Sequence, residues 1–185
     1  MEWIVVGLLL AVMAWIIWTY NLFASLRHRI QNAWKQIDVQ LKRRHDLIPN
    51  LVESVKGYMK YEQETLQKVM EARSRAVSST GVKASAEAEN ALTQTLGRIF
   101  ALMENYPELK ANENVLRLQE ELTTTENQIA FARQYYNDLV MRFNMRQEIF
   151  PASLIAGFFN FKPSEFFNVP EAEKAVPRVD LKFGA

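Results

Sequence analysis

Four charged or titratable side chains stand next to one another at Arg43, Arg44, His45 and Asp46, and Pro49 follows three residues later. A histidine beside a carboxylate can act as a general acid or base. Neighbouring basic side chains can also hold a phosphate group or a nucleic-acid backbone. This run is therefore the first place to look for catalysis or for nucleic-acid binding.

The motifs that accompany such chemistry are missing from the sequence. It contains no H-E-x-x-H zinc motif, no G-x-x-x-x-G-K-[ST] phosphate loop and no G-x-S-x-G elbow. There are no cysteines, and neither His28 nor His45 has the glutamate three residues earlier that a di-iron bundle requires. The net charge is only +1, and aspartates flank the basic run Lys42–Arg44. We therefore expect no enzyme, no cofactor or metal site and no nucleic-acid partner.

Polar side chains recur instead within the apolar stripes of two long helical segments. A buried charge needs a partner, because an unpaired one costs on the order of several kcal/mol. If the two segments are antiparallel, we expect an interhelical polar network that fixes the register of the helices. Pairing of the same residues between subunits, and a ligand or catalytic site, are the alternatives. The predicted network consists of Arg44, His45, Glu62, Arg73, Glu126, Asn127, Arg133 and Asn137.

The uncharged segment Trp3–Leu26 precedes these elements. As a helix, its roughly 24 residues would reach about 36 Å, enough to cross a hydrocarbon core of about 30 Å. Trp18 and Tyr20 lie near its second end, where aromatic residues mark the boundary between membrane and water. Because the segment follows Met1-Glu2 and is itself followed by basic residues, we interpret residues 1–26 as a retained transmembrane anchor and not as a signal peptide.

The basic residues after the segment predict its orientation. Arg27 and Arg29 follow the anchor directly, whereas only the α-amino group offsets Glu2 before it. The positive-inside rule then places the N-terminus outside and the rest of the chain in the cytoplasm, on a single-pass protein of the bacterial inner membrane. We expect Arg27 and Arg29 to contact anionic lipid headgroups.

Apolar residues continue at helical spacing beyond the anchor, from Ile30 to Ala76. The pattern predicts one very long helix, or two nearly collinear helices, from the membrane to about Val77. The segment Ser78–Val82 then breaks it. A second helix is expected from about Ser85, its N-cap, to Asn105.

A third helix is predicted from Asn112, another N-cap residue, to about Glu148. Pro151 can open a short fourth helix, because a proline at a helix start loses no needed hydrogen bond. The whole pattern predicts an all-α fold, in which residues 27–159 form an antiparallel bundle of three long helices plus a short fourth. We expect the tail, residues 160–185, to be irregular and to fold back onto the bundle through its phenylalanines.

Pro49 predicts an irregularity within the first helix. Proline has no N–H, so the carbonyl of His45 loses its helical partner. We expect a kink at this point, or a helix that restarts with Asp46 as its N-cap. The residues around Arg44 are then better interpreted as a hydrogen-bonded joint than as an active site.

Three segments of the sequence carry a family resemblance: "YNLFASLRHRIQNAWKQIDVQLKRRHDLIPNLVESVKGYMKYE", "NENVLRLQEELTTTENQIAFARQYYNDLVMRFN" and "FPASLIAGFFNFKPSEFF". In this order they resemble the LemA family of bacterial membrane proteins. The resemblance implies an N-terminal transmembrane helix, outside at its N-terminus, followed by a long-helix bundle. It implies no established activity. LemA-like genes often neighbour a membrane-bound zinc metalloprotease, and one relative takes part in magnetosome membrane formation, which suggests an envelope or membrane-organising role by analogy.

Three functions follow from these features. The first is a self-assembling scaffold at the bacterial cell envelope, with the lipid bilayer and further copies of the chain as partners. The second is an adaptor or modulator of a membrane-bound metalloprotease. The third is direct membrane remodelling by an aromatic group that dips into lipid or, alternatively, packs on the bundle end: Phe158, Phe159, Phe161, Phe166 and Phe167.

Overall fold

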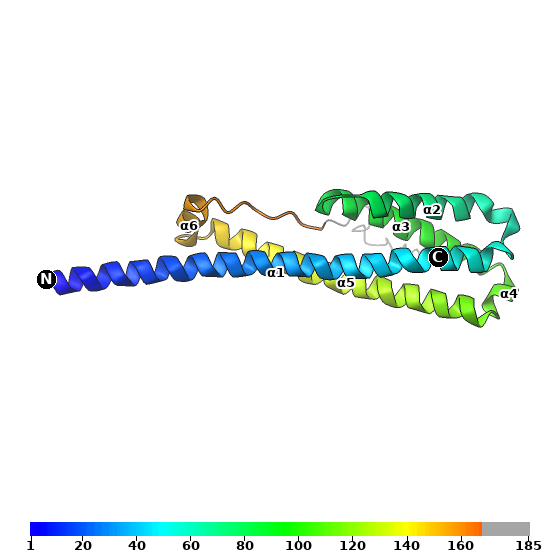
Figure 1. Cartoon of the computed structure of the whole chain (residues 1–185), viewed down its shortest axis with the longest axis horizontal. Helices are drawn as coiled ribbons and strands as arrows, with labels where there is room; N and C mark the ends of the chain where they lie inside the picture. Colours follow the sequence, from blue (N-terminus) through cyan, green and yellow to red (C-terminus); the bar gives the residue numbers. More distant parts are fainter. Residues whose placement is uncertain (168–185) are drawn as a thin grey trace, which may run out of the picture.

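The computed structural model describes residues 1–167, and within them the fold is entirely helical. Figure 1 shows the elements in their order along the chain. They are α1 (Glu2–Lys56), a single 3-10 turn (Lys60–Glu62), α2 (Gln63–Ser78), α3 (Val82–Met103), α4 (Pro107–Lys110), α5 (Glu113–Glu148) and α6 (Ala152–Phe158). The prediction of an all-α bundle with a long apolar N-terminal helix is confirmed.

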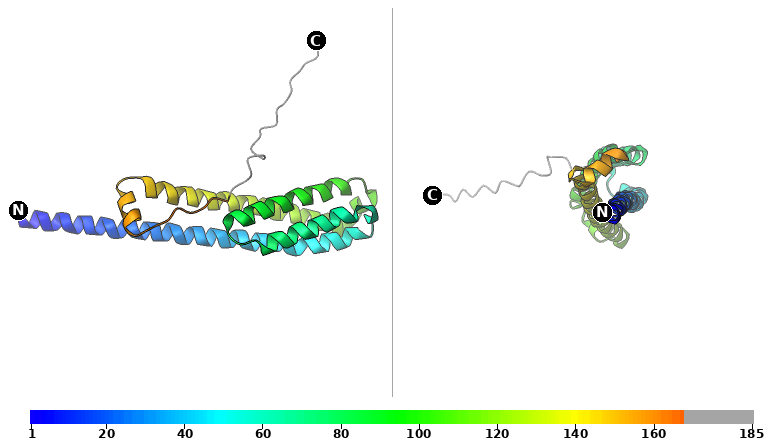
Figure 2. Two further views of the ribbon diagram at one scale, coloured as in Figure 1. Left: turned by 90° about the horizontal axis from the view of Figure 1, so that it is seen from above. Right: turned by 90° about the vertical axis from the view of Figure 1, so that its left-hand side faces the viewer.

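The helices α1 and α5 form the long axis of the molecule. They lie side by side in Figure 1 and in both views of Figure 2, and they share the most extensive contact between any two elements of the described chain. The hairpin of α2 and α3 packs on this pair at the end farther from the N-terminus. The short α6 lies at the other end of α5, beside α1, and the first part of α1 extends well beyond it.

The prediction of one very long helix, or of two nearly collinear helices, up to about Val77 is wrong. α1 ends at Lys56, and α2 runs back along the bundle, antiparallel to α1. Met59 lies in the turn and is fully buried, and Leu66 of α2 joins the same core. Apolar spacing reports only which face of a helix is buried, so it is unchanged when the chain reverses direction.

Of the two predicted helix N-caps, one is wrong and the other is confirmed. Ser85 does not begin a helix, because α3 starts at Val82, after Gly81. By contrast, the Asn112 side chain caps α5 as predicted, and its Oδ1 accepts hydrogen bonds from the N–H groups of Asn114 and Val115 at 3.1 and 3.3 Å. A short helix also follows Pro151, as predicted.

The core has two parts. The part near α6 contains Phe23, Ile37 and Phe143, and the part beneath the α2–α3 hairpin contains Ile48, Leu92 and their apolar neighbours. Arg44 separates the two parts along α1. The buried face of α1 is therefore apolar over most of its length and is interrupted by Arg44 between the two parts of the core.

Within residues 1–167, α1 is the helix whose length and composition would allow it to cross a membrane. Its first side chains are exposed, including Leu9 and Trp18, and burial begins with Thr19 and Phe23. The packed bundle therefore starts inside the segment predicted as the anchor, residues 1–26.

The described part of the predicted tail is irregular and folds back along α5. Phe167 is 1% exposed, and Phe161 stacks on Phe23 with ring centroids 5.1 Å apart. Phe166 remains 41% exposed. The rest of the predicted tail, 168–185, lies outside the described residues.

Candidate functional site

Arg44 is the centre of the polar cluster predicted from the sequence. Its side chain is fully buried. The guanidinium donates to the carboxylates of Glu89 on α3 and Glu126 on α5, and its Nη1 also donates to Thr93 Oγ1 at 2.9 Å. One arginine of α1 thus connects α1, α3 and α5, and two carboxylates face its single positive charge.

Glu89 is the second buried ion of this cluster, with only 1% of its side chain exposed. Its Oε1 lies 2.8 Å from His45 Nε2. Burial alone would raise the pKa of the Glu89 carboxyl. The hydrogen bond with His45 and the charge of Arg44 outweigh that effect, so the pKa is lowered from its ordinary value of 4.5. Glu89 is therefore held as a carboxylate.

Sequence reasoning missed Glu89 as a member of the cluster. A usable signal was present, because Glu89 lies three residues after Ala86 and three before Leu92, both of which are buried. It therefore occupies a core position of α3, as Arg44 does in α1.

The carbonyl of His45, which Pro49 deprives of its helical partner, accepts a hydrogen bond from Arg73 Nε of α2 at 2.6 Å. α1 continues through Pro49 without interruption. The predicted restart of the helix, with Asp46 as its N-cap, is therefore wrong. The side chain that supplies the missing hydrogen bond comes from the returning helix α2. Arg73 thus joins α2 to the polar residues of α1.

A second polar group lies on α5 toward α6 and holds the tail. Asn137 donates to the Phe167 carbonyl at 3.0 Å and accepts from the Phe167 N–H at 2.8 Å. Asn144 makes the same pair of bonds with Ser164, both at 2.9 Å. The Arg133 guanidinium lies over the Phe167 ring, 4.5 Å from its centroid. Arg133 and Asn137 therefore contact the tail.

The remaining predicted residues lie outside both groups. Glu62 is in the turn beyond the end of α1, and that end already lies about three helical turns past Arg44. Asn127 is exposed at the rim of a small cavity beside Arg44. Arg27 and Arg29 are exposed on α1, and the Arg27 guanidinium lies 5.7 Å from the centroid of the Phe161 ring. Their contact with lipid stays a prediction.

The chemistry available to the Arg44 cluster is limited by its own pairing. Glu89 binds both Arg44 and His45, and a cavity of about 360 Å³ beside them is lined by further charged side chains, Asp38 and Arg73 among them. In the described part of the chain, no three His, Cys, Asp or Glu side chains are placed to hold a metal ion. The geometry fits a structural junction.

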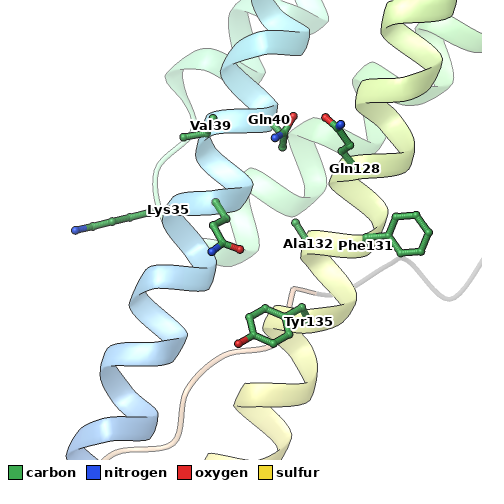
Figure 3. Close-up of a pocket in the computed structure, with 8 residues that line it drawn as sticks. Lys35, Val39, Gln40, Gln128, Phe131, Ala132 and Tyr135 are labelled. Atoms are coloured by element: carbon green, nitrogen blue, oxygen red, sulfur yellow. The ribbon is translucent and has the colours of Figure 1, made fainter.

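A groove of about 550 Å³ lies between α1 and α5 (Figure 3). Gln40 of α1 and Gln128 of α5 point toward each other across it, and Ala132 faces the groove about one turn along α5 from Gln128. Val39 and Phe131 stand at its two rims and are 64% and 72% exposed. Such exposure of large apolar side chains beside an open groove is typical of an interaction surface.

Together these features define a class of protein: an all-α bundle built on a long apolar N-terminal helix, with internally paired charges and an open apolar-rimmed groove. The chain belongs to the LemA family, whose family model matches residues 33–181. The resemblance seen in the sequence is thereby confirmed.

Relatives of known name agree with this assignment. Protein LemA of Metamycoplasma hominis is 28% identical over 149 residues, which cover 80% of this chain and 68% of that protein. Magnetosome protein MamQ 2 of Paramagnetospirillum magneticum is 22% identical over 183 residues, covering 85% of this chain and 67% of that protein. Magnetosome protein MamQ of Magnetospirillum gryphiswaldense is 22% identical over 186 residues, covering 86% and 68%. None of these names states an enzymatic activity.

Proposed function

We propose that this chain is a membrane-anchored bundle that assembles with further copies of itself and acts as a scaffold at the bacterial cell envelope. The observation that carries the proposal is the groove between α1 and α5. Its rims are the exposed side chains of Val39 and Phe131, and its floor contains Gln40 and Gln128.

The rims of the groove support a protein partner. Val39 and Phe131 are large apolar side chains that remain 64% and 72% exposed. A second copy placed over the groove would bury both rims.

Anchoring favours a second copy as the occupant. Copies that are anchored in one membrane by the first part of α1 have the same orientation and lie at the same height relative to the membrane. A two-fold axis parallel to the bundle can then bring one groove against the other, so that Phe131 of each copy contacts the same face of its partner. Restriction to a plane also raises the local concentration of this face.

The orientation belongs to the same proposal. The basic residues Arg27 and Arg29 follow the anchor, which supports a cytoplasmic bundle and an N-terminus outside. The relatives that are named as magnetosome proteins support a role in organising a cellular structure. No contact in the described chain favours the metalloprotease-adaptor alternative, for which co-purification with the protease is the test.

The experiment compares the oligomeric state of three full-length proteins in detergent micelles by light scattering coupled to size-exclusion chromatography. Phe131→Ser removes an apolar rim of the groove. Tyr61→Ser is the matched control, because Tyr61 is 96% exposed in the turn before α2, away from the groove. We expect the unchanged protein and Tyr61→Ser to be oligomers and Phe131→Ser to shift toward the monomer. An unchanged protein that is monomeric at every concentration would refute self-assembly.

A further inference from the structure

The segment that joins α5 to the tail, residues 149–161, carries no charged side chain. α6 lies within it, and Ile155 and Ala156 on its inner face are 7% and 4% exposed. Its outer face is apolar as well as open to solvent. The exposed fractions there are 51% for Ile149, 75% for Phe150, 62% for Leu154, 84% for Phe158 and 43% for Phe159. A soluble bundle would not gain from an apolar surface of this kind at its tip.

The position of this surface along α1 is the second observation. The Phe159 ring lies against Tyr20 with centroids 4.7 Å apart, and the Phe161 ring lies 5.8 Å from Tyr20. Tyr20 falls within the uncharged segment Trp3–Leu26. α6 is therefore level with the last part of the anchor, as Figures 1 and 2 show from two directions.

The length of α1 sets the depth of this surface relative to a membrane that α1 spans. The part of α1 before Thr19 covers about 26 Å, which is slightly shorter than a hydrocarbon core of about 30 Å. The bundle end that packs around Tyr20 must then lie at the membrane boundary. Phe150, Leu154 and Phe158 are exposed at this end of the bundle.

Charged side chains lie on the far side of this level. Arg27 and Arg29 of α1, Arg146 of α5 and Lys162 are all exposed, and Glu148 ends α5 just before the uncharged segment. Long basic side chains at this distance from the apolar layer can reach lipid phosphates. Along the bundle, the apolar surface is thus followed by basic side chains, which is the order found at the boundary between a membrane and water.

We propose that residues 149–159 form a second membrane contact, in which α6 lies in the interface of the leaflet where α1 emerges, with Phe150, Leu154 and Phe158 in lipid. Such shallow insertion of an apolar helix face is a common mode of interfacial binding. The proposal rests on α1 spanning the membrane, as proposed above. Two contacts fix the rotation of the bundle about α1 and hence the direction in which the groove faces.

The chain contains no cysteine, so single cysteines can be introduced and labelled without background. We would place an environment-sensitive fluorophore at Phe158→Cys, Leu154→Cys, Leu9→Cys or Phe131→Cys in the full-length protein. Each variant is reconstituted in vesicles of phosphatidylcholine and phosphatidylglycerol. Quenching by nitroxide-labelled lipid and by aqueous iodide is then measured, with circular dichroism as the control for folding.

We expect several-fold stronger lipid quenching at Phe158 and Leu154 than at Phe131, which lies on the groove, and strong lipid quenching at Leu9 inside the anchor. Lipid quenching at Leu9 together with iodide quenching at Phe158 and Leu154 would overturn this inference and leave the anchor intact. Protection of Phe158 from both quenchers would also overturn it, because a protein would then cover the face. If Leu9 were accessible to iodide, the anchor itself and this inference would fail together.

Discussion

Replacing Arg44 by methionine tests whether the buried cluster holds the three helices together. The side chain is fully buried, and methionine keeps much of its volume while removing the charge. Glu89 would then retain His45 as its remaining contact in this cluster, and Glu126 would retain the hydroxyl of Thr93 at 3.4 Å.

The expected loss follows from the burial of the two carboxylates. Removing one partner of a buried ion pair destabilises a protein by about 3–5 kcal/mol. Glu89 is 1% exposed and receives that full effect, whereas Glu126 is 35% exposed and contributes little. Because His45 can remain beside Glu89, we expect a loss of about 3 kcal/mol in the free energy of unfolding.

The assay is urea unfolding of the full-length protein in detergent micelles, followed by far-ultraviolet circular dichroism and analysed by linear extrapolation. Arg43→Met is the matched control. Arg43 lies 4.0 Å from Glu121, with side chains 51% and 36% exposed, so its replacement should cost less than about 1 kcal/mol.

The double variant Arg44→Met, Glu89→Met separates pairing from packing. If the two side chains stabilise each other, the double variant should recover most of the loss, because apolar replacement of both members of a buried pair is often nearly neutral. Strictly additive losses, or an Arg44→Met loss no larger than that of Arg43→Met, would refute a coupled buried cluster.

Three further predictions concern single positions. The folded-state pKa of Glu89 is lowered from 4.5. The stability that this carboxylate contributes is therefore present above pH 4.5 and is lost as the pH falls from there through the lower folded-state pKa. Urea melts of Glu89→Gln should show a shallower loss of stability across this pH range. Gly81 has a φ of +86°, so Gly81→Ala should destabilise the protein by about 1 kcal/mol or more, while Gly97→Ala, inside α3 with open space around it, should stabilise it by about 0.5–1 kcal/mol in thermal melts. Asn144→Ala should speed hydrogen exchange of the Ser164 amide, which donates to Asn144 Oδ1, and unchanged exchange would contradict this pairing.

Much of the fold could be predicted from the sequence, because apolar spacing and helix caps are local signals. The start of α5 at the Asn112 cap and the short helix after Pro151 follow directly from such signals. The reversal between α1 and α2 could not be predicted in this way. Met59 in the turn and Leu66 after it both continue the apolar spacing, and both enter one core.

Some members of the site could be predicted from the sequence, but Glu89 was missed, and the grouping of the polar residues could not be predicted. Arg44 and Glu126 attracted attention because they interrupt apolar stripes, and the structure places them in contact. Arg133 and Asn137 follow Glu126 at helical spacing on the same face of α5, yet they contact the tail. Spacing along a helix shows that a polar residue faces a neighbour, but it does not show which neighbour lies there.

The division of α5 between two neighbours follows from the lengths of the helices. α5 has 36 residues and α3 has 22, which correspond to about 54 and 33 Å, so the hairpin cannot cover α5 along its whole length. The extended tail covers the remainder.

An extended segment in this position cannot satisfy its own backbone groups, and each buried N–H and C=O needs a partner. The asparagine side chain offers one donor group and one acceptor, as a neighbouring strand would. Asn137 and Asn144 are seven residues apart, or about 10.5 Å along a helix, and Phe167 and Ser164 are three residues apart, or about 10 Å along an extended chain. The two spacings match, so each asparagine can bond both backbone groups of its partner residue. Polar positions in the stripe of α5 therefore serve two purposes: toward α3 they pair with a buried charge, and toward α6 they pair with the backbone of the tail.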